Sequence, residues 1–175
     1  VTIADFGSQA VICKFIKERF PNDIIVAEED AAELRKPGYS TILDRVTGYV
    51  RDFIPYASPE KVCSWIDYGS HFMQDRFWAL DPIDGTKGFL RGDQYAIALA
   101  LIEMGRVTLG ILACPNLSTD IHHPFGERGC LFLALKGKGS FQMDSKGVNR
   151  RPILVSKLEI PSEAIITESV EPDHA

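Results

Sequence analysis

The feature that most constrains the fold is a pair of apolar segments, residues 95–103 and 106–114, separated only by Met104-Gly105. Such a short connection between two apolar segments predicts a β-hairpin. In the first segment large residues alternate with mostly small ones, and a nearly continuous apolar run of this kind is typical of a strand buried on both faces. The chain is therefore expected to build a sheet around an antiparallel hairpin.

Further apolar segments predict the remaining strands. Residues 129–135 and 140–143 are joined by a glycine-rich connection and predict a second hairpin. Shorter strands are expected at residues 24–27, 77–80, 153–155 and 164–167.

Apolar residues at helical spacing predict three helices, at residues 5–20, 42–53 and 58–67. Asp5 is the expected N-cap of the first helix, and Ser58 followed by Pro59 is the expected start of the third. Helices that mostly precede antiparallel strands indicate the α+β class. We expect a layered α/β sandwich lobe with helices packed on a largely antiparallel sheet.

Composition and charge narrow the function. The 175 residues are expected to form one domain. The net charge is −5 and no basic stripe is visible, so a nucleic-acid partner is not expected, and no apolar run reaches the length of a membrane span. Four widely spaced cysteines predict reduced thiols in an intracellular protein. Because the chain starts at Val1, we expect a fragment, and the sequence does not distinguish cytoplasm from plastid or mitochondrion.

Acidic residues gather where predicted elements begin or end. In "WALDPIDGT", Asp81 and Asp84 follow the strand at residues 77–80, while Glu28-Glu29 ends the strand at residues 24–27. If the two strands are neighbours, Glu28, Asp81 and Asp84 share one cleft. Carboxylates that close must protonate or hold a cation, and oxygen ligands favour Mg²⁺ over Ca²⁺ or Mn²⁺.

The residues after Asp84 suit a phosphate group. Gly85 allows close approach of the backbone, and residues 86–88 can begin a helical turn whose N–H groups face an anion. The Thr86 hydroxyl can orient a water, and a carboxylate such as Asp5 can take its proton. These are the parts of a metal-assisted phosphoryl transfer to water.

Each of these features also has an ordinary structural interpretation when it is taken alone. The segment from Asp81 to Gly85 can be a surface turn. The acidic run at residues 28–30 can be a solvated strand end, and Asp5 can be only a helix cap. Their joint placement is what favours the chemical interpretation.

The motif Asp81-Pro82-Ile83-Asp84-Gly85-Thr86, together with the upstream Glu28-Glu29 pair, resembles the lithium-sensitive, magnesium-dependent phosphatase superfamily of inositol monophosphatase. The segments "VTIADFGSQA", "KGFLRGDQYAIAL", "LGILACPNL" and "GCLF" resemble its 3'(2'),5'-bisphosphate nucleotidase branch, especially plant forms. Inositol monophosphatases typically continue Gly-Thr-Thr-Asn-Phe, whereas this chain continues Gly85-Thr86-Lys87-Gly88-Phe89. The resemblance implies the N-terminal lobe of the inositol monophosphatase-like fold.

The resemblance also assigns roles to individual residues. It implies that two or three Mg²⁺ ions bind in the complete family site, with ligands from the side chains of Glu28, Asp81 and Asp84 and the backbone carbonyl of Ile83. Glu29 would lie just behind these ligands. Asp5 and Thr86 would share the attacking water, with Asp5 as the base. The scissile phosphate would contact Gly85 and Thr86, and the nucleotide would contact His174 in "ESVEPDH".

The implied activity is removal of the 3'-phosphate from adenosine 3',5'-bisphosphate to give AMP, with 3'-phosphoadenosine 5'-phosphosulfate and inositol 1,4-bisphosphate as further substrates. Two alternatives remain open: an inositol phosphate phosphatase, and a truncated metal-binding module without catalysis. The family's later Trp-Asp pair, its nucleotide-gripping Ser, Lys and Arg, and its first helix have no counterpart in this sequence. Residues 1–175 are therefore expected to be the metal-binding N-terminal lobe, without the C-terminal lobe.

Overall fold

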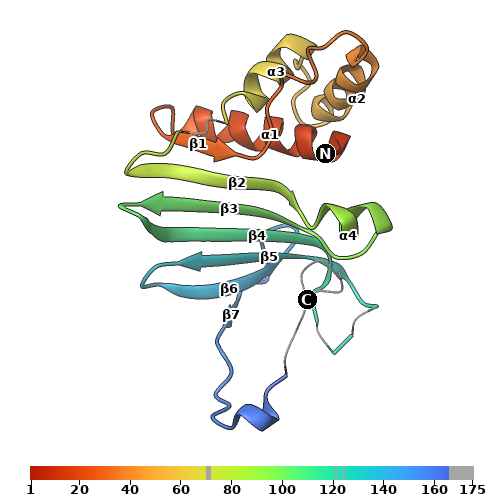
Figure 1. Cartoon of the computed structure of the whole chain (residues 1–175). Helices are drawn as coiled ribbons and strands as arrows, with labels where there is room; N and C mark the ends of the chain where they lie inside the picture. The colour runs from red at the N-terminus through yellow and green to blue at the C-terminus, as the bar shows by residue number, and fades with distance from the viewer. Residues whose placement is uncertain (70–71, 121, 124, 166–175) are drawn as a thin grey trace.

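The hairpin expected at residues 95–114 forms the middle of a sheet in the computed structural model, which describes residues 1–69, 72–120, 122–123 and 125–165. Within these residues the sheet has seven strands: Ile24–Ala27 (β1), Arg76–Asp84 (β2), Ala96–Glu103 (β3), Arg106–Ser118 (β4), Arg128–Leu135 (β5), Gly139–Asp144 (β6) and Arg151–Ile153 (β7). The strands lie side by side in chain order (Figure 1). Of these described strands, β1 and β2 alone pair in parallel, which confirms the predicted, largely antiparallel sheet.

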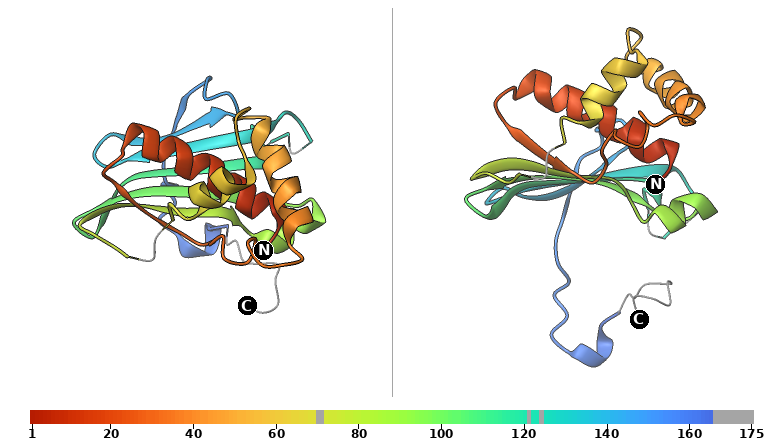
Figure 2. Two further views of the ribbon diagram at one scale, coloured as in Figure 1. Left: turned by 90° about the horizontal axis from the view of Figure 1, so that it is seen from above. Right: turned by 45° about the horizontal axis from the view of Figure 1, so that its top comes forward.

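The main helices gather on one side of this sheet. The helical elements are Ile3–Arg19 (α1), Ser40–Arg51 (α2), Pro59–Ile66 (α3), Thr86–Arg91 (α4) and the 3₁₀ turn Pro161–Glu163. Figure 2 shows α1, α2 and α3 stacked above the sheet, while α4 lies at the end of the strands. This is the layered α+β arrangement expected from the sequence. In the described part of the chain, no helix is both long and apolar enough to cross a membrane.

Two apolar clusters hold the layers together. One lies among the three helices and includes Phe6, Val50 and Ile66. The other joins α1 to the sheet and includes Ile25 and Trp78, which are paired across β1 and β2. The helical layer therefore packs chiefly against the first strands of the sheet.

The start of α1 differs from the prediction. Thr2, rather than Asp5, is the N-cap: its hydroxyl accepts a hydrogen bond from the Ala4 N–H at 3.1 Å. Asp5 completes a capping box, because its carboxylate accepts from both the N–H and the hydroxyl of Thr2, each at 2.6 Å. The third helix begins as predicted, with Ser58 as N-cap and Pro59 at the first helical position.

Four strand predictions also need correction. β2 continues through Asp84 instead of ending before Asp81, because it goes on pairing with β3 across an irregularity in register at Pro82. β3 is not buried on both faces: Leu101 is its one buried residue, since the helices cover only one side of the sheet. The short strand expected at residues 153–155 is β7, which ends at Ile153. No strand forms at residues 164–165, and the rest of the strand expected at 164–167 lies outside the described residues.

Candidate active site

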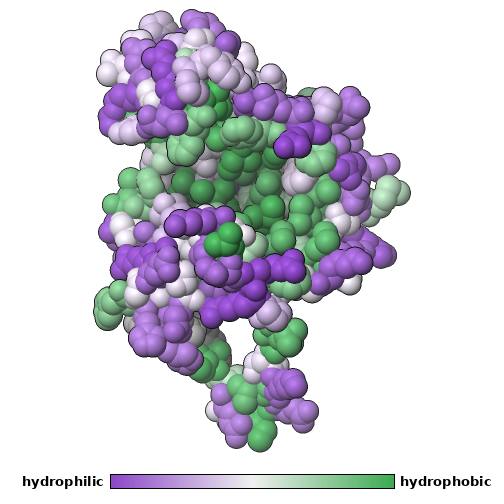
Figure 3. Space-filling view, turned by 180° about the vertical axis from the view of Figure 1, so that it is seen from behind, coloured by the Kyte–Doolittle hydropathy of each residue, from purple (hydrophilic) through white to green (hydrophobic). Residues whose placement is uncertain are grey.

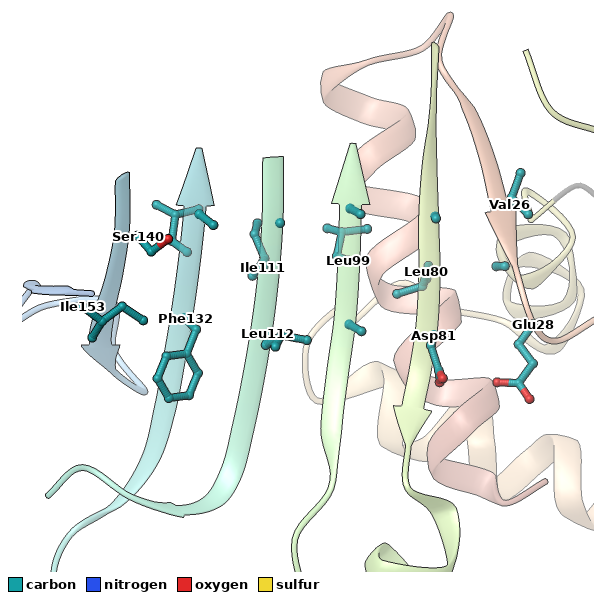
Figure 4. Close-up of a pocket in the computed structure, with 17 residues that line it drawn as sticks. Val26, Glu28, Leu80, Asp81, Leu99, Ile111, Leu112, Phe132, Ser140 and Ile153 are labelled. Atoms are coloured by element: carbon teal, nitrogen blue, oxygen red, sulfur yellow. The ribbon is translucent and has the colours of Figure 1, made fainter. Parts of the chain in front are cut away.

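The parallel pairing of β1 with β2 brings two predicted ligands together. In the register Ala27 lies opposite Leu80, so Glu28 and Asp81 follow side by side at the same edge of the sheet. Figure 4 shows the Glu28 side chain extending toward Asp81 from the neighbouring strand end. The sequence-based condition that the two strands be neighbours is therefore met.

A groove of about 670 Å³ opens beside this carboxylate pair on the sheet face that the helices leave uncovered. Small side chains of β2 and β3, among them Ala79, Ala98 and Ala100, form part of its floor. Glu28 and Asp81 lie on the β1–β2 side of the groove (Figure 4). Both acids are thus open to a small ligand, although Asp81 is partly buried.

The electrostatics of Asp81 reflect this crowding. Burial raises the pKa of Asp81 to about 6, and the nearby carboxylates of Glu28 and Asp84 act in the same direction. The Ile83 N–H opposes them, because it donates to Asp81 Oδ1 at 3.1 Å and stabilises the charged form. Like charges held in a partly buried place are the condition in which a cation binds favourably.

Two further acids lie deeper, against α1. Asp5 is 2% exposed and is held by Thr2 at the start of the helix. Burial raises the pKa of Glu29 to about 7, and Asp5 and then Glu28 add to the shift. Glu29 is thus buried and lies close enough to Asp5 and Glu28 to be affected by their charges. Its place behind the metal ligands stays a prediction.

The turn after β2 is built by Gly85 and Thr86. Gly85 has φ +83°, a left-handed conformation that favours glycine. The Thr86 hydroxyl donates to the Ile83 carbonyl at 3.1 Å, and α4 begins at Thr86, as the predicted helical turn requires. Thr86 and the Ile83 carbonyl are therefore held together at the same end of β2.

The donor set fits a hard divalent cation in its chemistry. It contains carboxylate oxygens from Glu28 and Asp81, with the exposed Asp84 close enough to influence the pKa of Asp81. Among the described residues, no three His, Cys, Asp or Glu side chains converge tightly enough to form a metal cluster. Asp84 as the third carboxylate ligand stays a prediction, and His174 lies outside the described residues.

Sequence reasoning missed one polar side chain at this site. Gln9 is fully buried one turn after Asp5 on α1, and its amide is hydrogen-bonded to the backbone of Glu29. The available signal was its spacing of four residues from Asp5, which places both side chains on one face of the helix.

Comparison with known proteins gives the family. The chain matches the inositol monophosphatase family over residues 1–175, and it belongs to this family. It is 43% identical over 197 aligned residues to "3'(2'),5'-bisphosphate nucleotidase 1" of Candida albicans, and 44% identical over 193 aligned residues to "3'(2'),5'-bisphosphate nucleotidase" of Oryza sativa. Each alignment covers 100% of this chain and 54% of the relative, so the chain spans about half the length of these curated relatives.

A solved structure supports the fold. The inositol monophosphatase from Anabaena (Nostoc) sp. PCC 7120 aligns with a TM-score of 0.52 and 24% sequence identity, over 89% of this chain and 41% of that protein. The helical layer and sheet described above therefore correspond to part of the inositol monophosphatase fold.

Proposed function

We propose that residues 1–175 form the metal-binding N-terminal lobe of a Mg²⁺-dependent phosphatase that removes the 3'-phosphate from adenosine 3',5'-bisphosphate to give AMP. The observation that carries the proposal is the Glu28–Asp81 pair at the adjoining ends of β1 and β2. Two adjoining carboxylates that line a groove, one of them exposed and the other partly buried, are stabilised by a divalent cation. The names of the nucleotidase relatives support the choice of substrate.

In this proposal the residues take separate roles. The Mg²⁺ ligands would be Glu28, Asp81, Asp84 and the backbone carbonyl of Ile83. Bound Mg²⁺ supplies positive charge that offsets the charge of a phosphate and lowers the pKa of a water. The Thr86 hydroxyl would orient the attacking water, and the Asp5 carboxylate would accept its proton.

The substrate would be a small nucleotide bisphosphate, with its scissile phosphate against Gly85 and Thr86. Contacts to the nucleotide itself would include His174. Further candidate substrates are 3'-phosphoadenosine 5'-phosphosulfate and inositol 1,4-bisphosphate.

The packing of Gly88 favours this activity over that of an inositol monophosphatase. A Cβ atom at Gly88 would lie 2.2 Å from the Gln94 carbonyl oxygen, far inside van der Waals contact. Inositol monophosphatases typically carry Asn at the corresponding place in Gly-Thr-Thr-Asn-Phe. The connection from α4 to β3 therefore requires glycine at position 88, which supports the resemblance to the nucleotidase branch.

The test is Mg²⁺-dependent release of phosphate from adenosine 3',5'-bisphosphate, compared with release from inositol 1-phosphate and inositol 1,4-bisphosphate. We expect the nucleotide to be the preferred substrate. Asp84→Asn should abolish the Mg²⁺-dependent release with little loss of fold, whereas Asp44→Asn, at an exposed position of α2, should leave it unchanged. Normal turnover by Asp84→Asn would contradict the ligand assignment.

A non-catalytic metal-binding module is the second candidate, because the chain spans only about half the length of its relatives. Calorimetric uptake of Mg²⁺ without any turnover would favour this candidate. Turnover by the chain alone would exclude it.

A further inference from the structure

Gln9 makes an unusual set of contacts for a side chain in the middle of a helix. It is 0% exposed, and its Nε2 donates to the Glu29 carbonyl at 2.6 Å and to the Ile66 carbonyl at 3.0 Å. Its Oε1 accepts from the Glu29 N–H at 3.0 Å. One amide therefore satisfies both backbone groups of Glu29 and a carbonyl at the end of α3.

The space around this amide is tightly filled. Gly69 passes so close that a Cβ atom there would lie 3.1 Å from Gln9 Nε2 and 2.9 Å from the Ala27 side chain. Water has little room to replace the amide, so loss of these bonds would leave buried backbone groups unpaired. The position of Glu29 relative to α1 is therefore set by this side chain.

Gln9 links the acid on α1 to the acids that follow β1. Asp5 lies four residues before Gln9 on α1, and both side chains are buried on the helix. Glu29 directly follows Glu28, whose carboxylate faces Asp81. A shift of the backbone at residue 29 would therefore move the Glu28 carboxylate relative to both Asp5 and Asp81.

We propose that Gln9 is a positioning residue, which fixes the spacing between the acid on α1 and the acids that follow β1 and so sets the affinity of the site for a divalent cation. This inference rests on the proposed function, because it takes Glu28 as a ligand. Gln9 touches neither ion nor substrate in this role. It acts through the Glu29 backbone, as partners behind metal ligands commonly act through the ligands.

The test uses Mg²⁺ alone as the probe, added to the chain in a calorimetric titration. Gln9→Met keeps the size of the side chain but removes all three bonds, and we expect it to weaken Mg²⁺ binding by about 10- to 100-fold. Gln9→Glu, which in its protonated form keeps an acceptor and a donor, should recover most of the affinity. Val62→Ala, a fully buried position on α3 away from the acids, is the control for loss of stability.

A second measurement separates the possible outcomes. Hydrogen exchange at the Glu29 amide should accelerate in Gln9→Met and stay slow in Val62→Ala. Equal losses of Mg²⁺ affinity in Gln9→Met and Val62→Ala, or no loss in Gln9→Met, would overturn the positioning role. Unchanged exchange at the Glu29 amide in Gln9→Met would show that Gln9 does not hold the Glu29 backbone. If exchange responds as expected but the parent chain takes up no Mg²⁺, both the proposed function and the metal role of Gln9 are overturned.

Discussion

The first two strands and the later strands of the sheet have the same regular pairing but very different surroundings. Under α1, Ile25 is 0% exposed and Trp78 is 5% exposed. Most residues of β4, β5 and β6 are only half-buried, although many are apolar. Figure 3 shows apolar side chains gathered in a hollow across the middle of the molecule, beside the helices and rimmed by polar side chains.

Backbone pairing and burial are therefore supplied by different parts of this chain. Pairing continues from β1 to β7, whereas desolvation occurs where the helices lie. The candidate active site is at the end of the covered strands. The cover of α1 explains why burial is the largest cause of the raised pKa of Glu29, whereas Asp81 is only partly buried and lines the groove on the uncovered face.

Truncating one isoleucine in each region should give the greatest difference in the free energy of unfolding. Ile25→Ala should lower the free energy of unfolding by about 2–5 kcal/mol, because it leaves a cavity in a closed core. Ile111→Ala, on the half-buried β4, should cost roughly 1 kcal/mol, because water already reaches that side chain. Urea unfolding of both variants measures the contrast. Equal losses would show that the open strands are covered in solution.

A change of pH should also alter the free energy of unfolding. The pKa of Asp81 is raised from 3.8 to about 6 and that of Glu29 from 4.5 to about 7, so the folded chain binds protons more tightly than the unfolded chain. The free energy of unfolding of the metal-free chain should therefore be higher at acidic pH and fall as the pH rises from the unfolded-state pKa values through the raised folded-state values.

Unfolding by urea at a series of pH values between 4.5 and 7.5 checks the direction, and Asp81→Asn with Glu29→Gln should flatten the profile. Added Mg²⁺ should also reduce the fall if the acids bind it. A free energy that rises steadily over the same interval would show that the acids are better solvated than the structure indicates.

The smallest effect concerns the edge of the covered region, where α1 begins. Thr2→Ala removes the N-cap and one partner of Asp5, and should lower the free energy of unfolding by about 1 kcal/mol. Ser58→Ala, which removes the longer 3.3 Å bond to the Lys61 N–H, should cost less. Thermal unfolding compares the two caps. A larger loss for Ser58→Ala would mean that Asp5 is held mainly by packing rather than by the capping box.

Several features of the candidate site could be predicted from local sequence. Apolar periodicity located β1 and most of the other strands, and "DPIDGT" located the turn at Gly85 and the start of α4. The extension of β2 to Asp84 could not be predicted, because Pro82 normally interrupts a strand and only pairing with β3 carries the strand past it. The role of Thr2 as cap was missed because Asp5, three residues later, is an equally good capping residue by type.

Local sequence is enough to set the helices, strands and turns and the kinds of acid at their ends, since periodicity and turn chemistry act over neighbouring residues. Long-range contacts are needed to place Glu28 beside Asp81, to bring Gln9 to the Glu29 backbone and to leave the later strands half-exposed. These facts depend on which distant segments pair and which surfaces the helices cover. An apolar pattern predicts that a face is buried, but it does not predict which segment covers that face.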